Sequence, residues 1–240
     1  MDRRTFLTVG VPRVVAGVAG CVGLLGCGQD RPNENLPAAQ KDHEDGVSVP
    51  EDLMREHGVL RRVLLVYQEC IRRVEAGQDL PPGVVKDSAS IIRTFIEEYH
   101  EKLEEDHLFQ RFEKAGVLAD LTKTLRQQHE AGRVLTADIL SLSDGERPMS
   151  PQDRAKLAQD MRSHIRMYRP HAAREDTVLF PALRRVCSPK EYEDLGETFE
   201  DTEHQLFGEE GFEKMVDKVA AIEKALGVYE LTQFTPPAGR

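Results

Sequence analysis

Apolar residues recur along residues 53–74 at alternating intervals of four and three, which is the period of one face of an α-helix. The stripe consists of Leu53, Leu60, Leu64, Tyr67, Ile71 and Val74. His57 occupies the stripe position between Leu53 and Leu60. The pattern therefore predicts a first helix that carries a titratable side chain on its buried face.

Three more segments with a helical period follow, and residues that end helices separate them. The second and third helices are predicted over about 84–114 and 117–142, with Gly116 between them. The fourth begins at Ser150, which is a capping residue followed by Pro151 in the first turn. All four helices are long enough to form a bundle.

The fourth helix also has polar residues on its apolar stripe. Its stripe positions are Leu157, Met161, His164, Tyr168, His171, Glu175 and Val178. Pro170 removes one backbone hydrogen bond beside His171, and it is expected to kink this helix.

A fifth helix is predicted from Ser188 to about Leu226, because Ser188-Pro189-Lys190-Glu191 has the pattern of a capping box. No segment shows the alternation expected of a strand. Long helices joined by short connections pack as antiparallel neighbours. The sequence thus predicts an all-α protein, with an up-down antiparallel four-helix bundle over residues 49–187 and an additional C-terminal helix and tail over residues 188–240.

Composition supports the helical class and narrows the choice of partners. Charged residues make up 31% of the 240 residues, aromatic residues make up 6%, and Trp is absent. This composition is typical of helical proteins with charged surfaces. The formal net charge of −10 repels a phosphate backbone, so nucleic acid is not expected as a partner.

The N-terminal segment, residues 1–27, has the features of an export signal. A basic start that includes Arg3 and Arg4 precedes an apolar stretch over residues 9–25 and then a polar run. Arg3-Arg4-Thr5-Phe6-Leu7 resembles a twin-arginine signal. Leu24-Leu25-Gly26-Cys27 resembles the lipobox of bacterial lipoproteins, and Cys21 is a weaker second match.

We therefore expect residues 1–27 to direct export and Cys27 to be lipidated. Residues 28–48 are polar and contain two prolines, so they are predicted to form a flexible tether. The protein is then expected at the periplasmic or cell-surface face of a bacterial membrane, held there by its lipid anchor. Cys70 and Cys187 remain in the mature chain, where they form either a disulfide or two unpaired core thiols.

A His-x-x-x-Glu motif occurs twice in the predicted bundle. It comprises His100 and Glu104 in the second helix, and His171 and Glu175 in the fourth. Residues four apart lie on the same helix face, about 5–6 Å from each other. Each motif can therefore direct an imidazole and a carboxylate at one point.

The first and third helices repeat as well. His57 with Arg61 recurs as His129 with Arg133, and this repeat has the same spacing along the chain as the His-x-x-x-Glu repeat, to within one position. The chain thus contains one helical hairpin twice. Stacking the two hairpins brings six polar side chains toward one pseudo-symmetric centre. They are His57, His100, Glu104, His129, His171 and Glu175.

Six buried polar groups need partners. Burying one such group without a partner costs about 2–7 kcal/mol, whereas a whole domain is stable by only about 5–15 kcal/mol. Imidazole and carboxylate together suit iron, manganese or zinc. A pair of metal ions at the centre is therefore the interpretation that satisfies all six groups.

This pattern resembles the hemerythrin and HHE cation-binding family, whose four helices supply His, His-x-x-x-Glu, His and His-x-x-x-Glu. The resemblance covers about residues 50–187. It implies two iron ions with an oxo or carboxylate bridge, and zinc or manganese as alternatives. The metal ligands that it implies are His57, His100, Glu104, His129, His171 and Glu175.

The chain departs from the oxygen-carrying members of that family. They have a second histidine four residues from the one on the third helix, but Leu125 and Arg133 stand at those positions here. They also use an aspartate five residues after the histidine of the fourth helix, which is the place of Asp176. Either Asp176 or Glu175 is a candidate ligand, and the internal repeat favours Glu175.

Three other histidines have open roles. His164 lies seven residues before His171, and it is a candidate for an additional metal ligand, for a group behind the ligands, or for a hydrated core residue. His107, seven residues after His100, has the same alternatives. His204, on the fifth helix, is expected to be structural or on the surface.

The resemblance implies a non-haem diiron protein that binds, senses or reacts with O2, NO or peroxide, or handles iron. Family membership leaves open whether it is an enzyme, and a role other than that of a dedicated enzyme is favoured. The incomplete histidine set argues against simple oxygen transport. Two alternatives stay open at this point. One is a diiron oxidase or ferroxidase, and the other is a zinc-filled or metal-free bundle that serves as an interaction module.

Overall fold

The computed structural model describes residues 47–144 and 149–237. All regular secondary structure in these two ranges is helical, so the predicted all-α class is confirmed. The predicted export signal, Cys27 and residues 28–46 of the predicted tether lie outside the described residues. Within the described ranges, none of the helices combines the length and the apolar character needed to cross a membrane.

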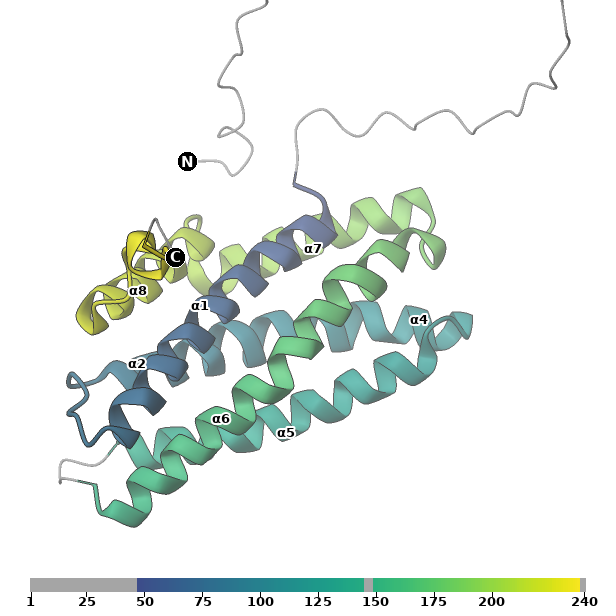
Figure 1. The fold of residues 1–240 in the computed structure, drawn as a ribbon. Helices are drawn as coiled ribbons and strands as arrows, with labels where there is room; N and C mark the ends of the chain where they lie inside the picture. The colour runs from purple at the N-terminus through teal and green to yellow at the C-terminus, as the bar shows by residue number, and fades with distance from the viewer. Residues whose placement is uncertain (1–46, 145–148, 238–240) are drawn as a thin grey trace, which may run out of the picture. The chain divides into compact units, whose positions relative to one another are not determined.

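Four long helical segments form the bundle (Figure 1). The first is α1 (Val49–Glu75). The second is continuous and consists of α2 (Val84–Ile91), the π-helix η2 (Ile92–His100), α3 (Glu101–Leu103), the π-helix η3 (Glu104–Phe109) and α4 (Gln110–Ala115). The third is α5 (Ala119–Ser143). The fourth is α6 (Pro151–Arg174), which continues as the π-helix η4 (Glu175–Leu179) and the 3-10 helix η5 (Phe180–Arg185).

The four segments pack around one interior. α6 packs against both α1 and α5, α2 packs against α5, and η2 contacts α1. Each segment follows its predecessor through a short connection, as in an up-down bundle. The bundle therefore has one central axis, along which side chains from all four segments meet.

The predicted stripe on α1 is buried in this interior. Leu53, Leu60 and Tyr67 are at most 1% exposed, and His57, which lies among them, is 1% exposed. The helix begins with a capping box in which Ser48 and Glu51 hydrogen-bond reciprocally. The prediction of a titratable side chain on the buried face of α1 is confirmed.

The C-terminal region contains two helices instead of the single helix predicted from Ser188 to about Leu226. They are α7 (Pro189–Phe207) and α8 (Gly211–Leu226), and the short 3-10 helix η6 (Leu231–Phe234) follows. The break occurs at Gly208, whose φ of +80° is a conformation that residues with a Cβ rarely adopt. α8 packs against α1 and α2, so the C-terminal pair covers one side of the bundle.

Gly132 is required where α5 and α6 approach each other closely. A Cβ at this position would lie 2.1 Å from the hydroxyl oxygen of Tyr168. Tyr168 is buried and donates a hydrogen bond of 2.6 Å to Glu101. We therefore expect Gly132→Ala to lower the free energy of unfolding by about 1–3 kcal/mol, because the added methyl displaces the ring.

Chemical denaturation measures this effect, and Gly58→Ala is a matched control. Gly58 also lies inside a helix, but a Cβ there would meet no atom within 4 Å. This control is expected to gain about 0.5–1 kcal/mol from the helix preference of alanine. Equal stability of the two variants would show that α5 and α6 are not in close contact at Tyr168.

Candidate metal centre

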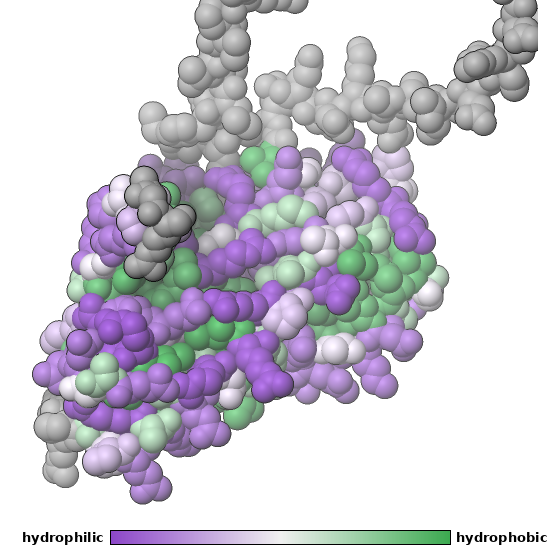
Figure 2. All heavy atoms as spheres, viewed as in Figure 1, coloured by the Kyte–Doolittle hydropathy of each residue, from purple (hydrophilic) through white to green (hydrophobic). Residues whose placement is uncertain are grey.

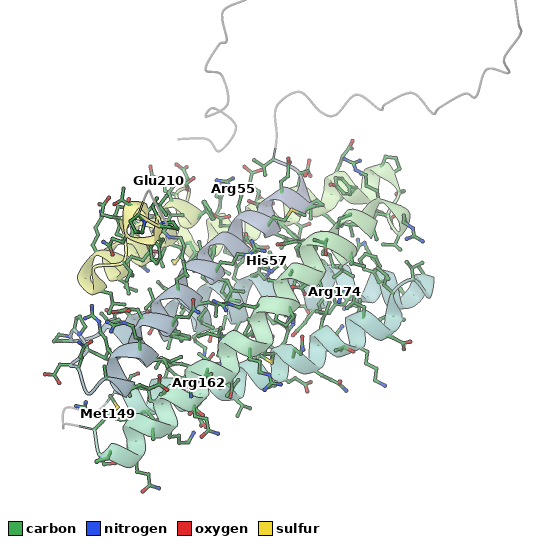
Figure 3. All side chains as sticks on the ribbon, in the orientation of Figure 1. Arg55, His57, Met149, Arg162, Arg174 and Glu210 are labelled. Carbon is green, nitrogen blue, oxygen red and sulfur yellow. The ribbon has the colours of Figure 1, made fainter. Side chains whose placement is uncertain are left out.

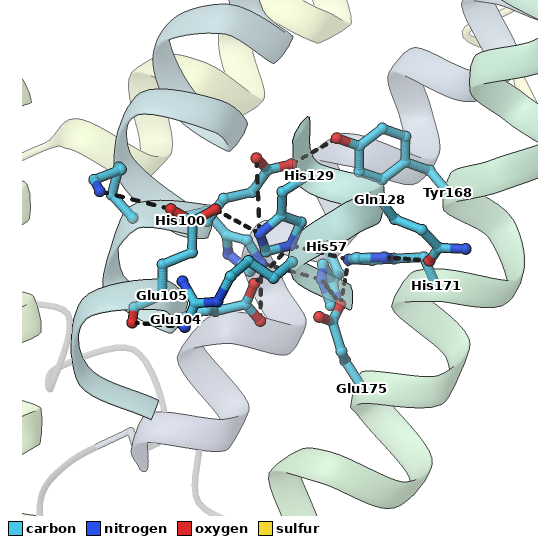
Figure 4. A network of polar contacts seen from close by, with 12 residues as sticks. His57, His100, Glu104, Glu105, Gln128, His129, Tyr168, His171 and Glu175 are labelled. Atoms are coloured by element: carbon cyan, nitrogen blue, oxygen red, sulfur yellow. Dashed lines mark hydrogen bonds and ion pairs between the residues drawn. The ribbon is translucent and has the colours of Figure 1, made fainter. Parts of the chain in front are cut away.

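Two pairs of histidine rings meet in the middle of the bundle (Figure 4). Nε2 of His57 on α1 lies 3.1 Å from Nε2 of His100 on η2. Nε2 of His129 on α5 lies 3.2 Å from Nε2 of His171 on α6. All four rings are buried, and Figure 3 shows His57 on α1, next to α6.

Glu104 and Glu175 lie between the two histidine pairs. The Glu104 carboxylate is 3.7 Å from Nε2 of His100 and 3.4 Å from Nε2 of His129. The Glu175 carboxylate is 3.1 Å from Nε2 of His171 and 3.4 Å from Nε2 of His57. Each carboxylate thus reaches one histidine of each pair, which is the arrangement needed to bridge two cations. The structure brings together all six side chains predicted as ligands, and their role as ligands stays a prediction.

Every ring presents its other nitrogen to an acceptor outside this cluster. The Nδ1 contacts are His57 with Asp176 at 2.7 Å, His100 with Glu56 at 2.7 Å, His129 with Glu105 at 3.0 Å and His171 with Gln128 at 2.9 Å. A carboxylate or amide oxygen accepts a hydrogen bond, so in the neutral rings the proton is on Nδ1. Nε2 then keeps its lone pair, which is the form that binds a metal.

The donor set fits a pair of cations. In both histidine pairs, two Nε2 lone pairs face each other, at 3.1 Å in one pair and 3.2 Å in the other. The oxygens of Glu104 and Glu175 have no hydrogen-bond partner among the described residues, and both side chains are fully buried. Lone pairs and carboxylates that converge without donors repel one another, and positive charge between them would remove this cost.

The pKa values of these groups reflect the same crowding. Burial, and then the charge of Glu175, raise the pKa of Glu104 well above its ordinary value. Burial alone would raise the pKa of Glu175, but the neighbouring His171 and His57 lower it by more, so the pKa lies below its ordinary value. Burial and the neighbouring His57 lower the pKa of His100. Without a cation, burial and the charge of Glu175 thus make a second negative charge at Glu104 unfavourable.

Two of the carboxylates that contact the Nδ1 atoms, Asp176 and Glu105, occupy equivalent positions in the internal repeat. Asp176 and Glu105 each come directly after a glutamate of the cluster, and each forms an ion pair with an arginine. Arg61 pairs with Asp176, and Arg133 pairs with Glu105 at 2.7 Å. Each arginine lies one turn after a histidine of the centre, so the repeat of Arg61 and Arg133 in the sequence corresponds to equivalent positions in the structure.

Sequence reasoning missed three of the four acceptors, namely Glu56, Glu105 and Gln128. A signal for them existed in the repeat. Glu56 and Gln128 stand directly before His57 and His129, so they occupy equivalent positions in the two halves. Because a residue next to a ligand on a helix points toward the neighbouring segment, these positions were candidates for this role.

Both His-x-x-x-Glu motifs lie where the helix widens. The π-helices η3 and η4 begin at Glu104 and Glu175, and η2 ends at His100. π-turns are rare and are frequent at functional sites. Pro170 lies inside α6, a few residues before η4. Periodicity did not predict the widened turns, because it assumes a regular α-helix.

The other candidate residues lie outside the six-residue cluster. Asp176 contacts His57 on the Nδ1 side of the ring, whereas Glu175 faces the Nε2 atoms. His107 is half-buried and packs edge-on against Phe199, and His204 is exposed. Of the alternatives left open for the cysteines, the disulfide is wrong, because Cys70 and Cys187 are both free; Cys70 is buried, whereas Cys187 is only half-buried.

His164 is fully buried two turns from His171. Its ring packs on Tyr168, with ring centroids 4.4 Å apart, and edge-on against Tyr67. Neither ring nitrogen has a hydrogen-bond partner among the described residues. Burial lowers the pKa of His164 to about 3.

This buried histidine makes stability depend on pH. Because the folded pKa lies below that of the unfolded chain, His164 is neutral in the folded state and takes up a proton only on unfolding as the pH falls below about 6.5. Stability is then lost by up to about 1.4 kcal/mol per pH unit between pH 6.5 and pH 3. We expect His164→Leu to flatten this dependence, as measured by denaturation at pH 7, 6, 5 and 4. An unchanged slope would mean that other groups cause the loss.

The fold and the centre together define a helical bundle with a buried cluster of paired histidines and carboxylates, which is the donor set of a cation-binding protein. Residues 48–183 match the family described as Hemerythrin HHE cation binding domain. The match covers more than half of the chain, and the chain belongs to this family. The family resemblance predicted from the His and His-x-x-x-Glu pattern is confirmed.

Close relatives occur in mycobacteria. "Uncharacterized protein Mb2018" of Mycobacterium bovis is 51% identical over 225 residues, which cover 93% of this chain and 88% of the relative. "Uncharacterized protein Rv1995" of Mycobacterium tuberculosis matches with the same identity and coverage. No solved structure matches the chain.

Proposed function

We propose that this protein binds two iron ions and uses them to bind, sense or react with a small ligand such as O2, NO or peroxide. The observation that carries this proposal is the convergence of four Nε2 lone pairs on two buried carboxylates that lack hydrogen-bond donors. His57 and His100 would hold one ion, and His129 and His171 the other. Iron would supply redox chemistry and open coordination positions.

The number of donors favours iron over zinc. Two imidazoles and two shared carboxylates would offer each ion four protein ligands. Four ligands complete the tetrahedral shell of a structural zinc site, which would leave no position for a further ligand. Iron in sites of nitrogen and oxygen donors accepts more ligands, so positions stay open for a diatomic molecule. Among the residues that the structure describes, the centre has no thiolate, because neither Cys70 nor Cys187 belongs to the histidine cluster.

We propose further that the protein acts at the cell envelope. The support is the twin-arginine pattern at Arg3-Arg4 and the lipobox that ends at Cys27. A protein with both would be exported in folded form and held at the membrane by lipid. Fractionation of cells that produce the full chain tests this: the wild type is expected with the membranes, and Cys27→Ser in the soluble fraction. Equal distribution of the two would count against the anchor.

The experiment that tests the metal proposal is metal analysis and visible spectroscopy of the full chain. The protein is purified without added metals, then reduced and exposed to O2 or NO. About two irons per chain, with charge-transfer bands that change on exposure, is the expected result. Stoichiometric zinc without visible absorption would favour a structural bundle. Steady O2 consumption with a reductant or with ferrous iron would indicate an oxidase or ferroxidase.

A further inference from the structure

We infer that a cavity between α1 and α6 is the route by which a small uncharged ligand reaches the metal centre, and that the equivalent place on the opposite side of the bundle is closed. This inference rests on the proposed function. The six side chains of the centre are arranged nearly symmetrically. A difference in access between the two sides must therefore come from the side chains around the centre.

The cavity has a volume of about 250 Å³. Its walls are formed by Leu60, Leu64 and Leu65 of α1 and by Tyr168 and Ala172 of α6, and Arg61 and Arg169 also line it. Leu65 is 43% exposed, whereas Leu60 and Ala172 are buried, so the cavity extends from the surface inward. Figure 2 shows that apolar patches interrupt the otherwise hydrophilic face that carries α1 and α6.

The inner wall belongs to the segments that carry the ligands. Leu60 lies one helical turn after His57 on the same face of α1. On α6, Ala172 directly follows His171, and the ring of Tyr168 lies 5.3 Å from the ring of His171. Three residues of the cavity wall, Leu60, Tyr168 and Ala172, thus lie within one helical turn of His57 or His171 along their helices.

The chemistry of the walls fits an uncharged diatomic molecule. The two arginines that also line this cavity, Arg61 and Arg169, are both exposed. Apolar cavities of this size accept small nonpolar molecules, because leucine and alanine side chains offer water few hydrogen-bond partners. O2 and NO are of this kind. A route with such walls would admit them to the centre.

The internal repeat shows that the opposite side is filled with charged groups. In the other half of the repeat, Thr136, Glu97 and Glu101 stand in the places of Leu64, Tyr168 and Ala172. Glu97 is buried and pairs with Arg93 at 2.8 Å. Glu101 is buried, accepts the hydrogen bond of Tyr168, and lies 3.0 Å from Arg133. On the opposite side of the bundle, these ion pairs occupy the place equivalent to the cavity between α1 and α6.

The repeat also provides a matched pair of test variants. Leu65 lines the cavity, and its equivalent in the other half is Ala137 on α5, which is exposed. Leu65→Trp is expected to narrow the cavity, whereas Ala137→Trp adds the same side chain on the opposite side. The wild type has no Trp, so the fluorescence of each variant reports whether its new side chain is in folded protein.

The kinetic measurement is NO binding to the reduced, iron-loaded full chain by stopped flow. We expect Leu65→Trp to slow association by about five-fold or more, and Ala137→Trp to stay within about two-fold of the wild type. The amount of NO bound at equilibrium is expected to be the same in all three proteins. Equal association rates at equal iron content would overturn the route.

A second measurement needs no metal. Xenon under pressure is expected to shift the methyl NMR signals of Leu60 and Leu64 in the metal-free full chain, and Leu65→Trp is expected to remove these shifts. Wild-type signals that do not respond to xenon would overturn the cavity as a route. A chain that binds xenon but takes up no iron would contradict the proposed function, and the inferred route with it. A chain that takes up iron but shows no response to xenon would contradict the route alone, so the two outcomes can be told apart.

Discussion

His171→Ala is expected to reduce the iron content from about two ions per chain to one or fewer. The substitution leaves His129 without its partner nitrogen at 3.2 Å and removes the nitrogen nearest to the Glu175 carboxylate. A metal that binds the folded chain at a thousand times its dissociation constant stabilises it by about 4 kcal/mol. Much of this metal-dependent stability should disappear with the ion. Metal analysis after gel filtration and thermal denaturation with and without iron measure both effects.

His164→Leu is the matched control for this experiment. His164 lies on the same helix and is equally buried, but it is outside the cluster, and its nitrogens face no ligand group. The control is expected to keep about two irons per chain and the wild-type spectrum. The ligand assignment is contradicted if both variants lose iron equally, or if His171→Ala keeps its full content.

The helices and the six clustered side chains were predictable because both depend on local periodicity. A stripe with intervals of four and three fixes one face of a helix, so the burial of His57 follows from its place among leucines. The repeat of His100 and Glu104 as His171 and Glu175 then indicates two equivalent hairpins. No long-range information is needed for either step.

The features that were not predicted depend on backbone conformations and contacts that a helical period does not encode. The break between α7 and α8 requires the positive φ of Gly208, whereas helical periodicity continues across it. The close approach of Tyr168 to Gly132 depends on the distance between α5 and α6. The π-helical turns that begin at Glu104 and Glu175 change which of the following residues point into the bundle, and a regular α-helical period does not predict such turns.

The two halves of the repeat differ in the acceptors that contact Nδ1 of the histidines. His100 presents its Nδ1 to the carboxylate of Glu56, whereas His171 presents its Nδ1 to the neutral amide of Gln128. A carboxylate behind an imidazole makes the ring a stronger donor than an amide does. The pair that contains His100 therefore offers a cation more negative charge than the pair that contains His171.

Glu104→Leu is expected to stabilise the metal-free protein by about 1–3 kcal/mol, even though it removes a group from the centre. The Glu104 carboxylate is fully buried and has no hydrogen-bond partner in the described residues. Burial raises the pKa of Glu104 in the folded protein above its pKa in the unfolded chain. The wild type therefore loses stability as the pH rises from the pKa of the unfolded chain toward that of the folded protein. Leucine has no such cost, so the variant's advantage should grow over this range. The same substitution should abolish stabilisation by iron.

Glu105→Leu, one residue further along, is expected to have the opposite effect on the metal-free protein. Glu105 accepts hydrogen bonds from His129 and Arg133, and these partners overcome its burial and lower its pKa to about 2. Its removal takes the nearest acceptor from both partners, at a cost of about 2 kcal/mol. Denaturation of the two metal-free variants at pH 7 compares them directly. If Glu104→Leu destabilised the protein as much as Glu105→Leu, the Glu104 carboxylate would be satisfied without a cation, and the main argument for a metal centre would fail.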